Sequence, residues 1–366
     1  MNKYQAERFF VANGEKYRNM WQAYEQLEGT PHNVQPIVEN STFENLKGLK
    51  INDNIDYETE LLQKIFKEYD NTCLLYSAGV DSHTIAVLAK KNNLQFDKIL
   101  TLCNGMDKKS PLNDFQVNND SKRFFSANDR VEIFYPSIEF YEKAIMTPKW
   151  WLHTPKLLLS SHNKLLFTDH YDPDTLYVSG KEKPNLLYKD KRWYLFFTHT
   201  TFIDNGHLPN NLYFFGINNI MPEIAISQAR KLREYYLHYT GTPESGTVIH
   251  HKMKLGSPDS NKFILGYNDA LGRHRLPDTT HETSQTRTNN IFDHRGVRRM
   301  QQLIDAGRQD IIDKFVLDCK HLYDTYPQIE WDWPMFVPKG RIPWILDIDS
   351  LECLPGDVFS DLAVRN

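Results

Sequence analysis

Short apolar segments alternate with amphipathic segments between residues 57 and 179 of this 366-residue chain. Residues 57–69 have helical apolar spacing, and residues 73–76 form an apolar run bounded by turn formers, which is typical of a buried strand. The pattern continues with expected strands at 98–103, 131–136 and 175–179 and expected helices at 82–92, 118–128 and 138–146. Strands that alternate with helices at this spacing predict βαβ units and a parallel sheet, so the predicted fold class is α/β.

The segments on either side of this alternation have other patterns. Apolar and aromatic positions over 3–28 recur at roughly helical spacing, which predicts an N-terminal helical segment followed by an extended connection. Residues 185–197 contain two apolar arms around a charged turn and predict a β-hairpin added to the sheet. Helical patterns return at 222–239 and 294–324. We therefore divide the chain into an N-terminal helical segment and connection (1–55), an α/β core with the hairpin insertion (56–240) and a polar loop with a mainly helical C-terminal extension (241–366).

The composition excludes several classes of protein. Hydrophobic residues at 40% and charged residues at 25% are ordinary for a globular chain and exclude wholesale disorder. The net charge of −4 does not favour a general electrostatic binder of DNA. Because there is no apolar run of about 18 residues and no signal peptide, we expect no membrane partner and a cytoplasmic location. The four cysteines are too widely spaced for a zinc ribbon or a redox pair.

The six residues from Ser77 to Ser82 (SAGVDS) join the first buried strand to the following helix. Small residues at 77–79 allow backbone N–H groups to point into one concavity, which can bind phosphate oxygens. The start of the helix adds unpaired N–H groups and the positive end of its dipole. Asp81 would repel phosphate unless a cation lay between them, so the pattern predicts Mg²⁺ at Asp81. A plain strand–turn–helix junction, with Asp or Ser as the helix cap, is the structural alternative.

The turn has no lysine after its glycine and so differs from the GxxxxGK[ST] loop. It resembles the SGGxDS signature of the PP-loop ATP pyrophosphatases, with Ala78 in place of the first glycine. The resemblance implies an adenine nucleotide α-hydrolase-like fold, an ATP-binding core at 56–240 and cleavage of ATP between its α and β phosphates. It also implies that the residues holding pyrophosphate are Ser77, Ala78, Gly79, Val80 and Ser82, with Asp81 positioning Mg²⁺.

A second loop follows the strand expected at 175–179. Val178 to Glu182 (VSGKE) is similar to a degraded form of the second loop in the synthetase domain of asparagine synthase, the PP-loop group that this chain most resembles. The resemblance implies that Gly180 faces the pyrophosphate, that Lys181 neutralises charge on the leaving group and that Glu182 joins Asp81 at the metal. A solvated lysine pair, Lys181 and Lys183, is the alternative.

Asparagine synthase also has a glutaminase domain with an N-terminal cysteine as nucleophile. Here the first cysteine is Cys73, so we expect no such domain in this chain. In general appearance the chain is also similar to phage-encoded PP-loop proteins.

Two further features give weaker predictions. Cys103 ends the strand expected at 98–103, where the PP-loop resemblance implies backbone contacts to adenine, although a packed core cysteine is the alternative. Residues 250–299 contain several His and Arg residues and could face a phosphorylated or nucleic-acid partner, or form an ordinary exposed loop. Part of 241–293 is predicted to lie over the C-terminal ends of the strands and to form a wall of the acceptor pocket.

These features together predict an ATP- and Mg²⁺-dependent adenylating ligase that releases pyrophosphate. The acceptor would be a small molecule or a nucleobase, whose carboxylate or amide oxygen is activated for attack by an amine or ammonia. Two alternatives stay open: a PP-loop enzyme that modifies a nucleobase in tRNA or DNA, and a non-catalytic nucleotide-binding protein.

Overall fold

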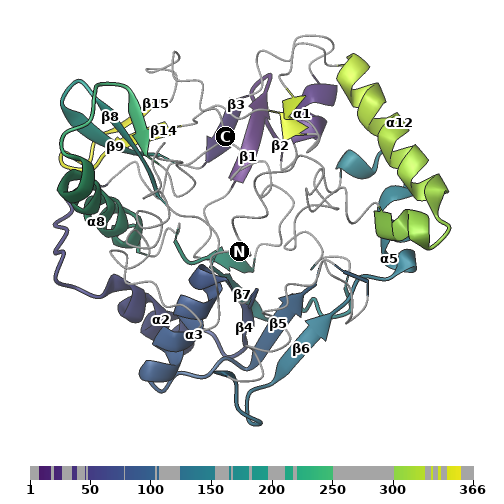
Figure 1. The fold of residues 1–366 in the computed structure, drawn as a ribbon, viewed down its shortest axis with the longest axis horizontal. Helices are drawn as coiled ribbons and strands as arrows, with labels where there is room; N and C mark the ends of the chain where they lie inside the picture. The colour runs from purple at the N-terminus through teal and green to yellow at the C-terminus, as the bar shows by residue number, and fades with distance from the viewer. Residues whose placement is uncertain are drawn as a thin grey trace.

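A parallel sheet of five strands forms one side of the molecule (Figure 1). The structure is a computed structural model that describes residues 8–17, 20–26, 35–38, 46, 48–77, 79–103, 105–106, 124–152, 165, 168–180, 184–196, 211–216, 221–249, 301–325, 331–332, 337–338 and 344–355. The sheet has the order β10-β7-β4-β5-β6, and all neighbouring strands in it are parallel. Its strands are β4 (Thr72–Leu75), β5 (Lys98–Leu102), β6 (Val131–Phe134), β7 (Leu176–Ser179) and β10 (Leu212–Phe214). The predicted α/β class is therefore confirmed, with β10 as an additional strand that the sequence pattern did not indicate.

Three helices before and between these strands lie close to their predicted positions. They are α2 (Tyr57–Glu68), α3 (Val80–Lys91) and α5 (Ile138–Ile145). Side-chain caps explain two of the starting points, because Asp56 accepts a hydrogen bond from the N–H of Thr59 and Ser137 accepts one from the N–H of Phe140. The helix predicted at 118–128 falls mainly outside the described residues.

Both faces of the parallel sheet are buried, as expected for parallel strands. Leu74 and Tyr76 pack with α2 and α3 on one face, whereas Cys73 and Leu75 pack in a separate cluster on the other. Burial raises the pKa of the Cys73 thiol to about 12, which keeps it neutral. Cys73 is therefore a core residue, with none of the thiolate character of a reactive cysteine.

A second sheet is antiparallel and has the order β11-β8-β9-β14-β15. Its strands are β8 (Asn185–Lys189), β9 (Arg192–Phe196), β11 (Thr247–Ile249), β14 (Trp344–Asp347) and β15 (Cys353–Pro355). The predicted hairpin at 185–197 is confirmed as β8 and β9, and its turn residues Asp190 and Lys191 both have positive φ. The expectation that it extends the parallel sheet was wrong, because its partners are β11 and β14.

The N-terminal helix predicted over 3–28 is also wrong for most of the described residues. Residues 8–17 form a hairpin of β1 (Arg8–Ala12) and β2 (Glu15–Tyr17), and β3 (Gln35–Val38) pairs with β1. Only α1 (Met20–Glu25) is helical there. The reason is local, because Asn13 and Gly14 both have positive φ and reverse the chain.

The C-terminal part of the chain is helical only in part. Within the predicted helix 294–324, α12 (Gln309–Thr325) is present and packs against α5. Beyond it, the described residues form β12 (Trp331–Asp332), β13 (Val337–Pro338) and the two strands of the second sheet. The described residues of 241–366 thus include both helix and strands, and a mainly helical extension stays a prediction. The second sheet takes strands from both sides of residue 240.

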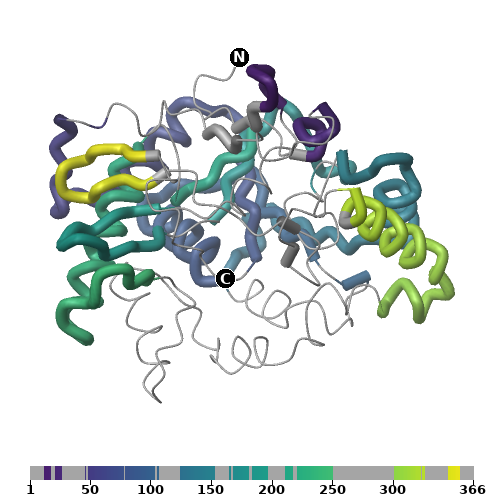
Figure 2. Tube along the Cα trace, turned by 90° about the horizontal axis from the view of Figure 1, so that it is seen from above, coloured from purple at the N-terminus to yellow at the C-terminus, as the bar shows by residue number. Residues whose placement is uncertain are grey.

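One long helix, α8 (Glu223–Thr240), packs against β8 and β9 of the second sheet and against α2. Figures 1 and 2 both show α8 beside β8 and β9, with α12 on the far side of the molecule. Within the described part of the chain, no helix combines the length and the apolar character that crossing a membrane requires.

Candidate functional site

The candidate phosphate-binding turn follows β4, the middle strand of the parallel sheet. Its glycine, Gly79, is the N-cap of α3 and has an extended conformation with no side-chain cap. Val80, Asp81 and Ser82 form the first turn of that helix, where backbone N–H groups lack partners within the helix. Ala78 lies outside the described residues. The strand-to-helix geometry that the sequence predicted at this position is therefore present.

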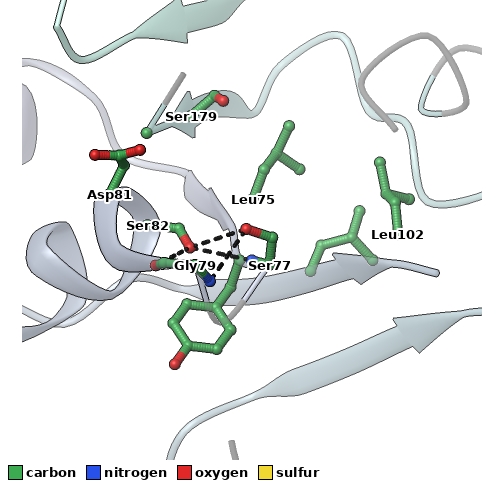
Figure 3. Close-up of a pocket in the computed structure, with 10 residues that line it drawn as sticks. Leu75, Ser77, Gly79, Asp81, Ser82, Leu102 and Ser179 are labelled. Atoms are coloured by element: carbon green, nitrogen blue, oxygen red, sulfur yellow. Dashed lines mark hydrogen bonds between the residues drawn. The ribbon is translucent and has the colours of Figure 1, made fainter. Parts of the chain in front are cut away.

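The two serine hydroxyls of the turn bond mainly to the turn itself (Figure 3). Ser82 Oγ accepts from the N–H of Ser77 at 3.2 Å, lies 3.3 Å from Ser77 Oγ and donates to the carbonyl of Gly79 at 3.2 Å. Ser77 Oγ also accepts from the N–H of Gly79 at 3.4 Å. Ser82 is buried and its hydroxyl donates to the Gly79 carbonyl, so Ser82 stabilises the turn itself. Ser77 is exposed and is better placed to contact a ligand.

Gly180, at the end of β7, touches the start of α3. A Cβ added at Gly180 would lie 2.6 Å from the backbone N of Ser82 and 2.7 Å from the carbonyl carbon of Asp81, too close for any other residue type. Gly180 therefore lies against the first turn of α3, while its predicted contact with pyrophosphate stays a prediction, and Lys181 and Glu182 lie outside the described residues.

The strand order reverses at this point. From β4 the chain moves through β5 to β6 in one direction, while β7 and β10 lie on the opposite side of β4. In open α/β sheets, ligands bind outside the carboxyl ends of the strands where the order reverses. The ends of β4 and β7 carry Ser77 and Gly180, so the turn occupies the position that this topology favours for a ligand.

A pocket of about 200 Å³ opens at these strand ends. Its described lining residues are Leu75, Tyr76, Ser77, Gly79, Asp81, Ser82, Leu100, Leu102, Ser179 and Gly180. Pockets for small molecules usually measure roughly 300–1,000 Å³. The space enclosed here therefore suits a phosphate group or a pyrophosphate better than a whole nucleotide.

Asp81 and the serines lie on different sides of the pocket. In Figure 3 the Asp81 carboxylate points toward the end of β7, near Ser179, whereas Ser77 lies toward Leu75 and Leu102. Its Oδ1 is buried. One carboxylate beside a phosphate site suits Mg²⁺, which is commonly held by one or two carboxylates together with phosphate oxygens and water. Asp81 is the one acidic side chain among the described residues that line the pocket. The described residues contain no group of three or more His, Cys, Asp or Glu side chains arranged for a metal.

For Cys103 the sequence left two predictions open, a backbone contact to adenine and a packed core cysteine, and the structure shows its side chain in the core. Cys103 is buried in the hydrophobic cluster that contains α2 and α3, and its backbone N–H donates to the carbonyl of Phe134 at 2.9 Å. Two residues of the preceding strand, Leu100 and Leu102, line the pocket; they lie two residues apart and so share one face of β5. Backbone contact between Cys103 and adenine stays a prediction.

Sequence reasoning missed five lining residues: Leu75, Tyr76, Leu100, Leu102 and Ser179. The available signal was their position at the C-terminal ends of neighbouring parallel strands. The predicted basic region at 250–299 falls outside the described residues. Of the segment 241–293, part of which was expected to cover the strand ends, only residues 241–249 are described, and they include β11 of the second sheet. Comparison of the chain with protein-family models, curated proteins and solved structures found no match.

Proposed function

We propose that this chain is an ATP- and Mg²⁺-dependent adenylating enzyme that releases pyrophosphate. The observation that carries the proposal is the SAGVDS turn, which sits at the start of α3, at the end of the central strand, and in backbone contact with Gly180 of the second loop. Exposed helix N-termini and turns with small residues bind phosphate oxygens through backbone N–H groups. Because a lysine of the P-loop kind is absent from the turn, cleavage between the β and γ phosphates is the less favoured chemistry.

In this proposal the chain contributes mainly binding and positioning. Ser77 and the first-turn N–H groups of α3 hold the β and γ phosphates, while Asp81 holds Mg²⁺, which supplies charge neutralisation for the departing pyrophosphate. An acceptor oxygen attacks the α phosphorus in line, pyrophosphate leaves, and an amine or ammonia then displaces AMP from the adenylate. Lys181, by the PP-loop resemblance, would stabilise charge on the leaving pyrophosphate.

The reaction products test the proposal. The chain is incubated with Mg²⁺, ATP labelled at the α phosphate and panels of amino acids, nucleosides, tRNA and DNA. We expect labelled AMP or an adenylated acceptor, together with pyrophosphate, from at least one panel. Release of ADP and orthophosphate would place the chain in another class. ATP binding without turnover across all panels would favour the non-catalytic alternative, and turnover only with nucleic acid would favour nucleobase modification.

A substitution of Asp81 tests the metal assignment separately. Asp81→Asn keeps the shape of the side chain and removes its charge, so we expect ATP affinity in the presence of Mg²⁺ to fall about tenfold or more while Mg²⁺-free binding changes little. Asp70→Asn is the matched control, because Asp70 is exposed at the opposite end of β4. Calorimetry that finds the same Mg²⁺ effect in wild type and Asp81→Asn would refute the role of Asp81.

A further inference from the structure

The residues immediately before and after the SAGVDS turn are joined by a side-chain hydrogen bond. The hydroxyl oxygen of Tyr76 lies 3.1 Å from Nδ1 of His83, and both side chains are almost fully buried, with exposed fractions of 1% and 3%. The backbone of each residue is also held. Tyr76 donates its N–H to Leu100 and accepts at its carbonyl from the hydroxyl of Thr101, while the N–H of His83 donates to Gly79. The bond thus links the end of β4 to the first turn of α3.

Two further aromatic side chains, Phe124 and Phe125, complete a cluster around the Tyr76–His83 pair. The ring centroids of Phe125 and Tyr76 lie 4.9 Å apart and those of Phe124 and His83 lie 4.6 Å apart, both in edge-on contact. The centroids of the two phenylalanine rings lie 5.0 Å apart. Lys90 of α3 fixes this arrangement, because its ammonium lies over the Phe124 ring and donates to the Phe124 carbonyl at 3.0 Å. A buried polar pair surrounded by aromatic rings has little freedom to rearrange, since losing its hydrogen bond would leave a polar atom in an apolar environment.

We propose that Tyr76 and His83 are positioning residues that hold the SAGVDS turn in its phosphate-binding shape through their shared hydrogen bond. The reason is preorganisation. A turn that already has its bound shape loses less conformational entropy when a ligand binds, so affinity rises without any new contact to the ligand. The pair itself need not touch the ligand, because it acts through the two ends of the turn. The ligand-binding part of this inference rests on the proposed function, whereas the effect on the turn does not.

Amide hydrogen exchange, followed by NMR on the full chain, tests the effect on the turn directly. The amides to follow are those of Ser77 and position 83, which bond inside the turn to Ser82 Oγ and the Gly79 carbonyl. Tyr76→Phe removes only a hydroxyl, and His83→Leu removes the ring nitrogen that meets it. Because one hydrogen bond is lost in each case, we expect exchange at these two amides to accelerate about threefold to tenfold. His83→Asn places an amide group near the former Nδ1 position, so we expect it to restore most of the protection.

Tyr57→Phe is the matched control. Tyr57 is also buried and its hydroxyl accepts from the N–H of Asn52 at 2.9 Å, but Tyr57 lies on α2, away from the turn. We expect this variant to lower the melting temperature and to leave exchange at the turn unchanged. Unchanged exchange in Tyr76→Phe, or equal acceleration in Tyr57→Phe, would overturn the proposal. If Tyr76→Phe does not fold, the comparison of His83→Leu with His83→Asn decides it.

Calorimetry with Mg²⁺ and inorganic pyrophosphate then tests the link to the site. We expect Tyr76→Phe and His83→Leu to weaken pyrophosphate binding about threefold to tenfold, and His83→Asn and Tyr57→Phe to bind like wild type. Wild-type binding that none of these variants alters would overturn the link to ligand affinity. If the wild type itself binds no pyrophosphate or ATP, the proposed function fails, and the exchange measurement still decides whether the pair holds the turn.

Discussion

The absence of a side chain matters to different degrees at the two glycines of the site, Gly180 and Gly79. Gly180 allows the end of β7 to approach the backbone of Asp81 and Ser82, which are not free to move because they belong to α3. Gly79 meets only a side-chain atom, since a Cβ there would lie 3.2 Å from Ser77 Oγ. Neither glycine has a positive φ, so the two positions differ in the room for a side chain and not in backbone conformation.

This difference makes a prediction about Gly180→Ala. The added methyl would push β7 away from α3, so we expect a loss of about 1–3 kcal/mol in the free energy of unfolding and clearly weaker Mg·ATP binding. Gly79→Ala is the control and should cost less than about 1 kcal/mol, because the serine hydroxyl can rotate away. Urea denaturation of both variants checks the order. If both variants lost the same free energy of unfolding, the close approach of Gly180 to the backbone of Asp81 and Ser82 would not hold in solution.

At the scale of secondary-structure elements, the edge strand β6 is tied to the sheet by a cluster of charges. Glu132 lies 2.9 Å from His170 Nδ1, 3.6 Å from Lys98 Nζ and 2.8 Å from the Arg130 guanidinium. Burial acts to raise the pKa of the Glu132 carboxyl, but Lys98, the hydrogen bond with His170 and Arg130 outweigh it and hold the pKa below its usual value. The cluster lies among residues near the N-terminal ends of the strands, away from the candidate site.

The lowered pKa of Glu132 predicts a pH-dependent contribution to stability. Because the folded-state pKa is below the unfolded one, this contribution is present above pH ~4.3 and is lost as the pH falls through the folded-state value. We expect Glu132→Gln to unfold about 1 kcal/mol more easily than wild type at pH 7.

Urea titrations between pH 7 and pH 3 measure this difference, which should shrink below pH ~4. The exposed Glu68 on α2 offers Glu68→Gln as a control with little effect at either pH. A Glu132→Gln difference that stays constant with pH would contradict the assignment.

At the scale of the whole molecule, α8 contributes to two hydrophobic cores. Ile224 at its start packs with the parallel sheet, α2 and α3, whereas Ala225, Ala229 and Leu232 pack with the second sheet. Arg230 of the same helix donates to the carbonyl of Ile348, next to β14. A single rigid helix that belongs to both cores should make the two sheets unfold together.

Leu232→Ala tests this coupling. Leu232 is fully buried, so the truncation should cost about 2–5 kcal/mol. We expect differential scanning calorimetry to show a single transition, moved to lower temperature, that includes both sheets. Glu234→Ala, on the exposed face of α8, is the control and should shift the transition little. Two separate transitions in the wild type would mean that α8 does not couple the sheets.

Local sequence patterns determined the parallel sheet and the place of the candidate phosphate-binding turn. The strands β4, β5, β6 and β7 and the helices α3 and α5 each fall within a few residues of their predicted bounds. The turn at 77–82 could be placed because its small residues and its strand-to-helix position are local properties. In contrast, Asn13 and Gly14 reverse the chain inside a segment whose apolar spacing looked helical, since two positive-φ residues outweigh a weak periodic pattern.

Tertiary structure alone decided which distant segments meet. Strand pairing depends on contacts between residues far apart in sequence, so nothing local shows that β9 pairs with β14, about 150 residues later, and not with the parallel sheet. The same holds for the pocket. Leu100 and Leu102 line it because β5 lies beside β4, and Gly180 touches α3 because β7 lies on the other side. The sequence determined the chemistry of the turn, and the order of the strands decided what surrounds it.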